Sequence, residues 1–215
     1  MSEPPRGEPL PNADRLAKSL VSMVIAKLRL PRERRVVIAV AGESGSGKST
    51  TARWLGRELS NAGVLTGLIH QDDYFLRPPR TNHEYRLLDL RHVGPHEVNL
   101  DLLQSHIDVF LDGRVGVEAP AVDYPANRFV TQRLDFSRLS ALIVEGTYVF
   151  RLRGIDVRVF LEATHEDTKE RRRVRNRDID APVIDQILTI EHEIIARQAM
   201  QADIVIDRDF DVRLR

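Results

Sequence analysis

Cysteine is absent from this sequence of 215 residues. Its absence excludes disulfides, thiolate metal ligands and a cysteine nucleophile, and it fits a reducing, cytoplasmic environment. Long hydrophobic runs are missing too, since none approaches the ~20 residues of a membrane helix. Charge of one sign is not in excess, because 32 basic residues balance 32 acidic ones. We therefore expect neither nucleic acid nor a membrane surface as a partner.

The N-terminal stretch MSEPPRGEPLPN is polar and rich in proline. It lacks the apolar core of a signal peptide, so residues 1–13 are expected to form a disordered tail. Apolar residues then recur at helical spacing from Leu16 to Leu28, which predicts an amphipathic helix over residues 14–30. The hydrophobic content of 42% suffices for one core. We expect a single domain over residues 31–215, with the helix as an appendage.

Short apolar runs alternate with helical patterns along the rest of the chain. Strands are expected at 36–40, 64–70, 139–145, 156–163 and 203–207, and helices at 48–59, 97–110, 166–177 and 182–200. VGVEAPAV and RFVTQRLDF, joined through DYPAN, predict a β-hairpin. Residues 71–95 are polar and contain prolines, which is typical of an active-site connection rather than a linker. The alternation predicts an α/β fold, a mostly parallel sheet with helices on both faces.

The stretch AGESGSGKSTTARWL, residues 41–55, follows an apolar strand and opens a helix. It matches the phosphate-binding pattern G-x-x-x-x-G-K-[ST], which arises by chance in about one chain in a hundred of this length. Glycines let successive backbone N–H groups point at phosphate oxygens, and the helix N-terminus adds positive charge. Lys48 is expected to neutralise the β- and γ-phosphates, and Ser49 to bind Mg²⁺. The predicted nucleotide-binding residues are Gly42, Ser44, Gly45, Ser46, Gly47, Lys48, Ser49 and Thr50.

Two carboxylates stand where predicted strands end. Asp72, in HQDDYF, is expected to orient an attacking hydroxyl, to accept its proton and to contribute to the Mg²⁺ site. The alternative for Asp72 is a loop or capping aspartate, which is the interpretation we keep for Asp73. Glu145, which follows the apolar residues of LIVEG, is expected on the Mg²⁺ side, and a charged strand terminus without a ligand is its alternative.

The segment KERRRVRNRD, residues 169–178, carries five arginines. Such a run is usually a solvated helix face or a nucleic-acid patch, and the neutral charge of the chain disfavours nucleic acid. Guanidinium groups match the oxygens of a migrating phosphoryl group, so we expect a lid at about residues 166–182. Helical spacing places Arg171 and Arg175 on one face, with Arg172 beside them, and not all five reach one phosphate.

In chain order, GESGSGKSTTA, HQDDYF, VDYPANR, LIVEGTYVF, RVFLEATHEDTKERRRVRNRD and ADIVI resemble the uridine kinase and phosphoribulokinase family of P-loop kinases, over residues 36–207. The phosphate loop is generic, whereas QDDYF, VEG and the arginine segment in this order are more specific. The resemblance implies a P-loop NTPase three-layer fold with a five-stranded parallel sheet, a hairpin over the acceptor pocket, ATP and Mg²⁺ as cofactors, and a homo-oligomer. It also implies the roles of five residues: Asp72 as the catalytic aspartate, Ser49 and Glu145 on the magnesium side, and Arg175 and Arg177 in the lid, with Arg172 as a further candidate.

The acceptor side departs from uridine kinases. Val122 occupies the place of a tyrosine that reads the pyrimidine in those enzymes, and DYPANR lacks their histidine. Loss of such groups weakens discrimination, so a different hydroxylated small molecule, such as a sugar or another nucleoside, competes with uridine. Their ribose-gripping FDHP is replaced by LRHVGPHEV, with Asp89, Arg91, His92 or Glu97 as substitutes. The predicted acceptor-binding residues are Tyr74, Asp89, Asp123, Tyr124 and Arg128, and a plain hairpin turn is the alternative for the hairpin residues.

Three functional hypotheses remain. The first is a kinase that transfers the γ-phosphate of ATP to a small-molecule hydroxyl. The second is a nucleotide-dependent regulatory module with slow hydrolysis, whose N-terminal helix contacts a partner. The third is a kinase for an already phosphorylated sugar, gripped by Arg91 and Arg128. The seven histidines show no metal-binding spacing and are expected mostly at the surface, whereas Trp54 is expected in the core.

Overall fold

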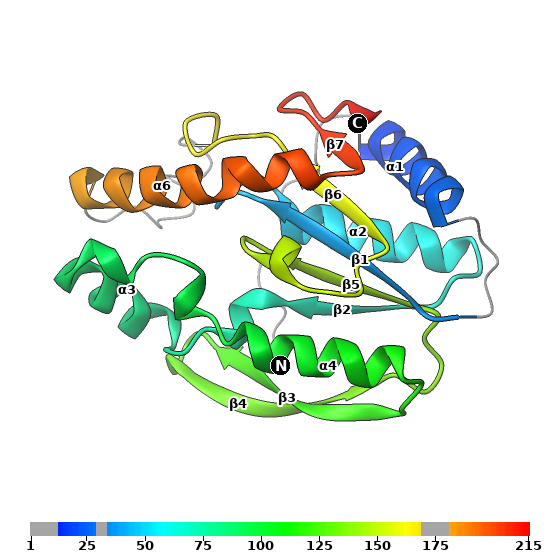
Figure 1. The fold of residues 1–215 in the computed structure, drawn as a ribbon, viewed down its shortest axis with the longest axis horizontal. Helices are drawn as coiled ribbons and strands as arrows, with labels where there is room; N and C mark the ends of the chain where they lie inside the picture. The colour runs from blue at the N-terminus through cyan, green and yellow to red at the C-terminus, as the bar shows by residue number, and fades with distance from the viewer. Residues whose placement is uncertain (1–12, 29–33, 169–180) are drawn as a thin grey trace.

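The computed structural model of the protein describes residues 13–28, 34–168 and 181–215. Its centre is a six-stranded sheet with the order β2-β5-β1-β6-β7-β8, in which every strand is parallel to its neighbours except β8 (Figure 1). The strands are β1 (Val36–Gly42), β2 (Thr66–His70), β5 (Ala141–Gly146), β6 (Val157–Leu161), β7 (Ile204–Ile206) and β8 (Val212–Leu214). A separate antiparallel hairpin consists of β3 (Gly116–Asp123) and β4 (Arg128–Asp135).

Helices cover both faces of this sheet. The α-helices of the described ranges are α1 (Ala13–Leu28), α2 (Lys48–Asn61), α3 (Pro79–Leu88), α4 (Leu100–Leu111) and α6 (Ala181–Ala196). Short 3₁₀ helices are η1 (Gln71–Tyr74), η2 (Leu90–His92), η3 (Pro95–Glu97), η4 (Val149–Arg151) and η5 (Arg197–Gln201). Among the described residues, no helix has both the length and the apolar character needed to cross a membrane. The predicted α/β fold with a small hairpin is confirmed, and the sheet has one strand more than the family resemblance implies.

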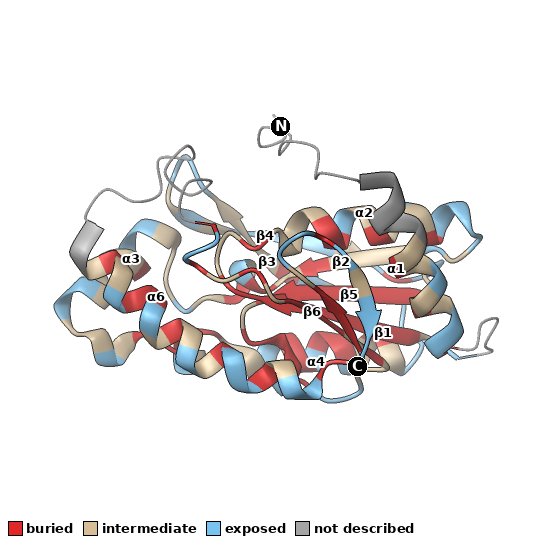
Figure 2. Cartoon of the chain, turned by 90° about the horizontal axis from the view of Figure 1, so that it is seen from above, coloured by how far each residue is buried: buried red, intermediate tan, exposed pale blue. Residues whose placement is uncertain are grey.

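The sheet divides the core into two clusters, because successive side chains of a strand point to opposite faces. Val37 and Ala39 of β1 pack on the side of α4 and α6, whereas Ile38 and Val40 pack on the side of α1 and α2. All residues of β1 and β5 are buried, and the buried centre of the sheet appears red in Figure 2. The continuous apolar runs in the sequence therefore reflect strands covered on both faces.

Helix α1 belongs to the core, which corrects the expectation of an appendage. Leu20, Val24 and Leu28 are at most 2% exposed and lie in one cluster with Leu55 and Leu59 of α2. Because Leu20, Val24 and Leu28 are buried against the domain, these three side chains are not available to a partner. The predicted tail falls almost wholly on residues 1–12, which lie outside the described residues.

Several elements differ from the sequence-based expectation. Helix α3 lies within the connection 71–95, where the pattern predicts no helix, and its first residue is Pro79, a position that tolerates proline. Helix α4 begins at Leu100 rather than at residue 97, because the Asn99 side chain caps it by accepting the Leu102 N–H at 3.0 Å. Strand β8 is too short for its pattern to be detected.

Trp54 is only half-buried, which corrects its assignment to the core. The guanidinium carbon of Arg57 lies 5.2 Å from the centroid of the indole ring. The ring therefore lies at the surface of α2, partly covered by a cation.

Arg35 joins the base of the hairpin to α4. Its guanidinium donates to the carbonyl oxygens of Phe110 (2.9 Å), Arg114 (2.9 Å) and Phe136 (2.8 Å). The same group lies 5.0 Å from the centroid of the Phe110 ring. One cation thus satisfies the carbonyl groups at the end of α4 and at the return from β4.

Replacement of Arg35 by methionine should lower the free energy of unfolding by about 2–3 kcal/mol, because three carbonyl groups lose a charged donor. Arg138→Met is the matched control, since Arg138 is exposed and its loss should change stability by less than about 0.5 kcal/mol. Urea denaturation of both variants measures the difference. Equal stabilities would contradict this role of Arg35.

Candidate active site

Three strands bring the predicted site residues to one edge of the sheet. In the parallel register, Glu145 of β5 lies beside Val40 of β1 and His70 of β2. The phosphate loop leaves β1 at this edge, and η1 leaves β2 there. Because carboxyl ends of parallel strands form the ligand-binding edge of such sheets, this placement brings the phosphate loop and η1 to the same crevice.

The phosphate loop has the backbone shape that its glycines predict. Gly45 and Gly47 have φ values of 80° and 101°, a region that disfavours residues with a side chain. A Cβ atom on Gly42 would lie 2.9 Å from the Leu161 carbonyl oxygen. Helix α2 follows with no side-chain cap and no acidic residue in its first turn, so its first N–H groups remain available for phosphate oxygens.

Lys48 and Ser49, at the start of α2, both point back into this edge. The Lys48 ammonium donates to the Glu43 carbonyl oxygen at 2.8 Å, and the Ser49 hydroxyl donates to Glu145 Oε1 at 2.9 Å. Ser49 and Glu145 are thus brought together as the sequence predicts. His70 Nδ1 lies 2.6 Å from the same Glu145 oxygen.

The buried Glu145 carboxylate and the partly exposed His70 ring each shift the pKa of the other. Burial opposes ionisation of Glu145, but the hydrogen bond from His70 and the charge of Lys48 outweigh it and lower the pKa of Glu145. Burial likewise disfavours the charged form of His70, but the hydrogen bond to Glu145 and the charges of Glu145, Asp73 and Asp72 raise its pKa. The pair favours a carboxylate and an imidazolium side by side.

The residues at this edge fit a magnesium ion. A hydroxyl oxygen and a carboxylate oxygen already converge at Ser49 and Glu145, and oxygen is the donor that Mg²⁺ prefers. Glu145 is 4% exposed, so a divalent cation would compensate a carboxylate that water does not solvate well. Ser49 and Glu145 would hold the ion, and the part of Asp72 in this site stays a prediction.

Asp72 and Asp73 follow His70 on η1 and face different surroundings. Asp72 is exposed at the edge of the sheet, and its charge acts on His70. Asp73 Oδ1 accepts the Val122 N–H at 2.8 Å and so ties η1 to the hairpin. Burial, opposed by this hydrogen bond and by His70, raises the pKa of Asp73. The structural interpretation of Asp73 therefore agrees with its contacts.

The glycine of the VEG motif sets the position of η1. A Cβ atom on Gly146 would lie 2.3 Å from Gln71 Cβ, so only glycine lets η1 pack this closely on β5. Gln71 is fully buried, and its Oε1 accepts the Tyr148 N–H at 2.7 Å. Because Asp72 is the next residue in the chain, the absence of a side chain at Gly146 helps to fix where Asp72 stands.

We expect Gly146→Ala to displace η1 and to lower kcat by at least about tenfold, since a displacement near 1 Å costs about 100-fold in a positioned reaction. Nucleotide affinity should be unchanged, because the phosphate loop is not touched. A steady-state assay together with a nucleotide titration separates the two effects. Full kcat in the alanine variant would show that the close packing does not position Asp72.

Several predicted acceptor-binding residues are engaged within the protein. Tyr74 is 2% exposed and its hydroxyl lies 2.8 Å from His106 Nδ1, so the hydroxyl is engaged in the core, and the predicted acceptor role of Tyr74 stays a prediction. On the hairpin, Arg128 donates to Asp123 at 3.1 Å. Tyr124, at the hairpin tip, is 54% exposed.

The segment that replaces FDHP is also internally paired. Asp89 accepts hydrogen bonds from the Arg91 guanidinium and backbone N–H, and these lower the pKa of Asp89 to about 2. The His92 ring stacks on Tyr85 with centroids 3.7 Å apart. The acceptor-binding roles of Asp89, Asp123 and Tyr124 therefore stay predictions.

A buried ionic cluster, which the sequence gives no sign of, joins α3, η3 and α6. Arg86 donates to Glu97 at 2.6 Å and to Glu191 at 2.9 Å. The Asn82 amide donates to Glu97 at 2.8 Å. Burial and the charge of Glu97 raise the pKa of Glu191, opposed by Arg86 and Lys48. Because the Lys48 charge reaches Glu191, the cluster lies on the phosphate-loop side of the site.

His70 is the functional residue that sequence reasoning missed at the centre of the site. It ends β2 directly before the carboxylates of η1, and this position was the available signal. The expectation that histidines lie mostly at the surface is wrong for His106 and His165, which are 6% and 9% exposed. The predicted lid arginines Arg172, Arg175 and Arg177 lie outside the described residues.

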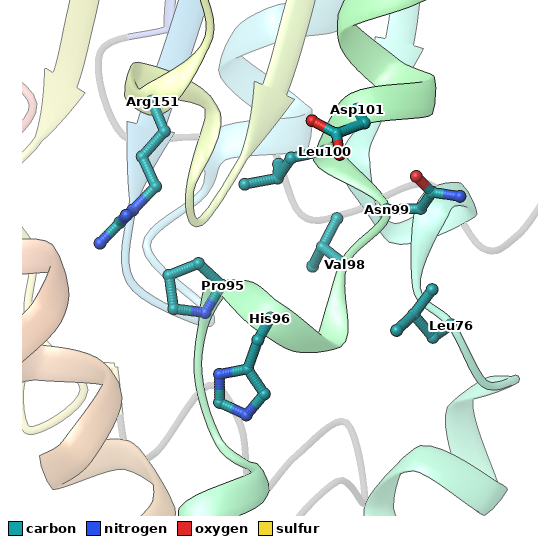
Figure 3. A pocket seen from close by; sticks show the side chains of 8 residues that line it. All are labelled: Leu76, Pro95, His96, Val98, Asn99, Leu100, Asp101 and Arg151. Atoms are coloured by element: carbon teal, nitrogen blue, oxygen red, sulfur yellow. The ribbon is translucent and has the colours of Figure 1, made fainter.

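Two hollows border these elements. The larger, of about 600 Å³, is lined by Leu76, Pro95, His96, Asn99, Asp101 and Arg151 among others, and contains neither a phosphate-loop residue nor a strand-end carboxylate (Figure 3). The smaller, of about 360 Å³, lies between β2, η1 and the hairpin and is lined by His70, Asp73, Val122 and Gln132 among others. His70, which contacts Glu145, and Asp73, which is next to Asp72 in the chain, line the smaller hollow, and for this reason rather than for its size we favour it as the acceptor side.

The sequence is similar to those of known proteins. The family model described as "Phosphoribulokinase / Uridine kinase family" matches residues 37–214. A bifunctional alpha-galactosidase/sucrose kinase of Mediterraneibacter gnavus is 31% identical over 194 residues, which cover 84% of this chain and 21% of that protein. A uridine kinase of Brevibacillus brevis is 28% identical over 158 residues, 72% of each chain.

The fold is shared more widely than the sequence. A possible uridine kinase from Bacillus stearothermophilus has a structure with a TM-score of 0.68, at 18% identity, over 89% of this chain and 97% of that one. At this identity the likeness concerns the fold alone.

Proposed function

The chain belongs to the phosphoribulokinase/uridine kinase family, and from that premise we propose that it phosphorylates a carbohydrate hydroxyl, with Asp72 as the residue that orients and deprotonates this hydroxyl. Membership makes the chain an ATP-dependent phosphotransferase with a small-molecule alcohol acceptor. The observation that carries the assignment of Asp72 is its place two residues after His70, at the edge where Ser49 meets Glu145.

In the proposed reaction the protein positions the reactants and neutralises charge, and it forms no covalent bond to either of them. The acceptor hydroxyl gives its proton to the Asp72 carboxylate as its oxygen bonds to the γ-phosphorus, and the bond to the ADP oxygen breaks. Lys48 and the N–H groups of the phosphate loop hold and neutralise the phosphates. Mg²⁺, when bound at Ser49 and Glu145, supplies further neutralisation of phosphate charge.

A carbohydrate is favoured over uridine by the wall of the smaller hollow. Val122 lines this hollow beside His70 and Asp73, so an aliphatic side chain stands where the family resemblance implies a pyrimidine-reading tyrosine. A site without that hydroxyl loses much of its discrimination for a polar base. The relative of 31% identity carries the name of a sucrose kinase, which supports a sugar for this chain.

A neutral acceptor is favoured over a phosphorylated one. Arg91 and Arg128, the candidates for an existing phosphate, each pair with a nearby carboxylate, Asp89 and Asp123. Both pairs are exposed and therefore weak, but each turns the guanidinium toward a carboxylate of the chain, which a phosphorylated sugar would have to displace. The lid arginines, a homo-oligomer and a cytoplasmic location stay predictions.

Asp72→Asn should reduce phosphoryl transfer at least about 100-fold, because the amide cannot take the proton. ATP affinity should be unaffected, since the phosphate loop is intact. Asp73→Asn is the matched control, because its Oδ1 still accepts the Val122 N–H, and transfer should stay within about tenfold. Unchanged turnover in Asp72→Asn, with ATP bound normally, would instead favour the regulatory module with slow hydrolysis.

A panel of acceptors with Mg·ATP identifies the substrate class. We expect at least one mono- or disaccharide to exceed uridine and cytidine by about 100-fold in kcat/KM. Mass spectrometry should show the sugar plus one phosphoryl group, and the product should be lost in Asp72→Asn. A higher kcat/KM for uridine than for every sugar would overturn the carbohydrate assignment while leaving the kinase assignment intact.

A further inference from the structure

Glu43, His165 and His192 converge beside the phosphate loop from three distant parts of the chain. Glu43 is the residue after Gly42, His165 follows β6, and His192 lies on α6. His192 Nδ1 is 2.6 Å from Glu43 Oε1, and His165 Nδ1 is 3.0 Å from Glu43 Oε2. One ligand atom from each residue lies within 4.8 Å of the other two. The chemistry proposed above uses none of these side chains.

We propose that these three residues bind a zinc ion. Two imidazole nitrogens and one carboxylate oxygen are the donor set of four-coordinate zinc sites that keep a fourth position for water. Mg²⁺ prefers oxygen donors alone, so this site and the site at Ser49 and Glu145 select different ions. The proposal is independent of the acceptor that the kinase uses.

The burial and the hydrogen bonds of Glu43, His165 and His192 favour metal binding. The Glu43 and His165 side chains are 8% and 11% exposed, whereas His192 is 41% exposed and gives an ion a route from solvent. The His165 backbone N–H donates to Glu43 Oε2 at 2.6 Å and holds the carboxylate in place. His165 Nε2 lies 3.4 Å from Glu166 Oε1, a carboxylate on the outer ring nitrogen, as is usual for metal-bound histidine.

A metal-free triad held by hydrogen bonds is the competing explanation. It requires a proton on Nδ1 of each ring, donated to Glu43. Zinc binding requires the loss of those protons, because only an unprotonated nitrogen ligates a metal. The two explanations therefore differ in whether added zinc is bound tightly at this place.

The triad is connected to nucleotide binding through Glu43. The Glu43 carbonyl oxygen accepts the Lys48 ammonium at 2.8 Å and the Ser46 N–H at 3.2 Å. A zinc ion on the Glu43 side chain would hold the loop in this arrangement, with Lys48 on the protein rather than on phosphate. Zinc should therefore weaken nucleotide binding, and the nucleotide should weaken zinc binding by the same factor.

Titration of the protein of 215 residues with Zn²⁺ against a chromophoric chelator tests the site, and Co²⁺ absorption in the visible range reports four-coordination. We expect one tight equivalent, and His192→Gln should lower its affinity at least about 100-fold. His96→Gln, which alters an exposed histidine, and Glu145→Gln, which alters the magnesium side, should retain it. Equal affinity in wild type and in His192→Gln, or loss confined to Glu145→Gln, would overturn the proposal.

The coupling has its own readout. With Mg²⁺ in excess, one equivalent of zinc should raise the Kd for ADP about fivefold or more in the wild type. The same addition should have no effect in His192→Gln. A Kd for ADP that bound zinc does not change would refute the coupling to Lys48.

Discussion

One oxygen of Glu145 holds the site together. It accepts the Ser49 hydroxyl from the start of α2 and lies 2.6 Å from His70 at the end of β2. Glu145 itself ends a central strand that pairs with both β1 and β2. A nearly buried carboxylate thus joins the phosphate loop to the strand that leads to Asp72. Its negative charge is kept by His70 and Lys48, against the opposing effect of burial.

The surroundings of Asp72, where we propose that the acceptor binds, are fixed at the same edge by close packing and by a hydrogen bond to the backbone. Gly146 lets Gln71 lie against β5, and Asp73 holds the hairpin strand through the Val122 N–H. Between these two anchors stands Asp72. The position of the proposed base therefore depends on a missing Cβ atom and on a neighbouring carboxylate, neither of which takes part in the chemistry. Asp72 is exposed at the sheet edge, while Gln71 and Asp73 on either side of it are held by these contacts.

Local patterns made the phosphate loop and Glu145 predictable, because each motif lies directly after an apolar strand and the parallel sheet brings such ends together. Contacts between distant segments were not predictable. Glu43 and His165 are 122 positions apart, and Arg86 and Glu191 are 105 apart. A short sequence motif therefore cannot predict either contact. Helix α3 escaped notice since prolines mask its start, and β8 because it has three residues. The sequence also does not show that the Tyr74 hydroxyl contacts His106 in the core.

The central claim is that Asp72 orients the acceptor hydroxyl while the phosphate loop holds the nucleotide phosphates in the same transfer reaction. A crystal structure with Mg·ADP, a trigonal or square-planar phosphoryl mimic and the preferred acceptor tests it most directly. The account predicts an Asp72 carboxylate oxygen about 2.6–3.2 Å from the acceptor hydroxyl, with that hydroxyl in line with the ADP oxygen. An acceptor hydroxyl held by another group, with Asp72 turned away from it, would contradict the account.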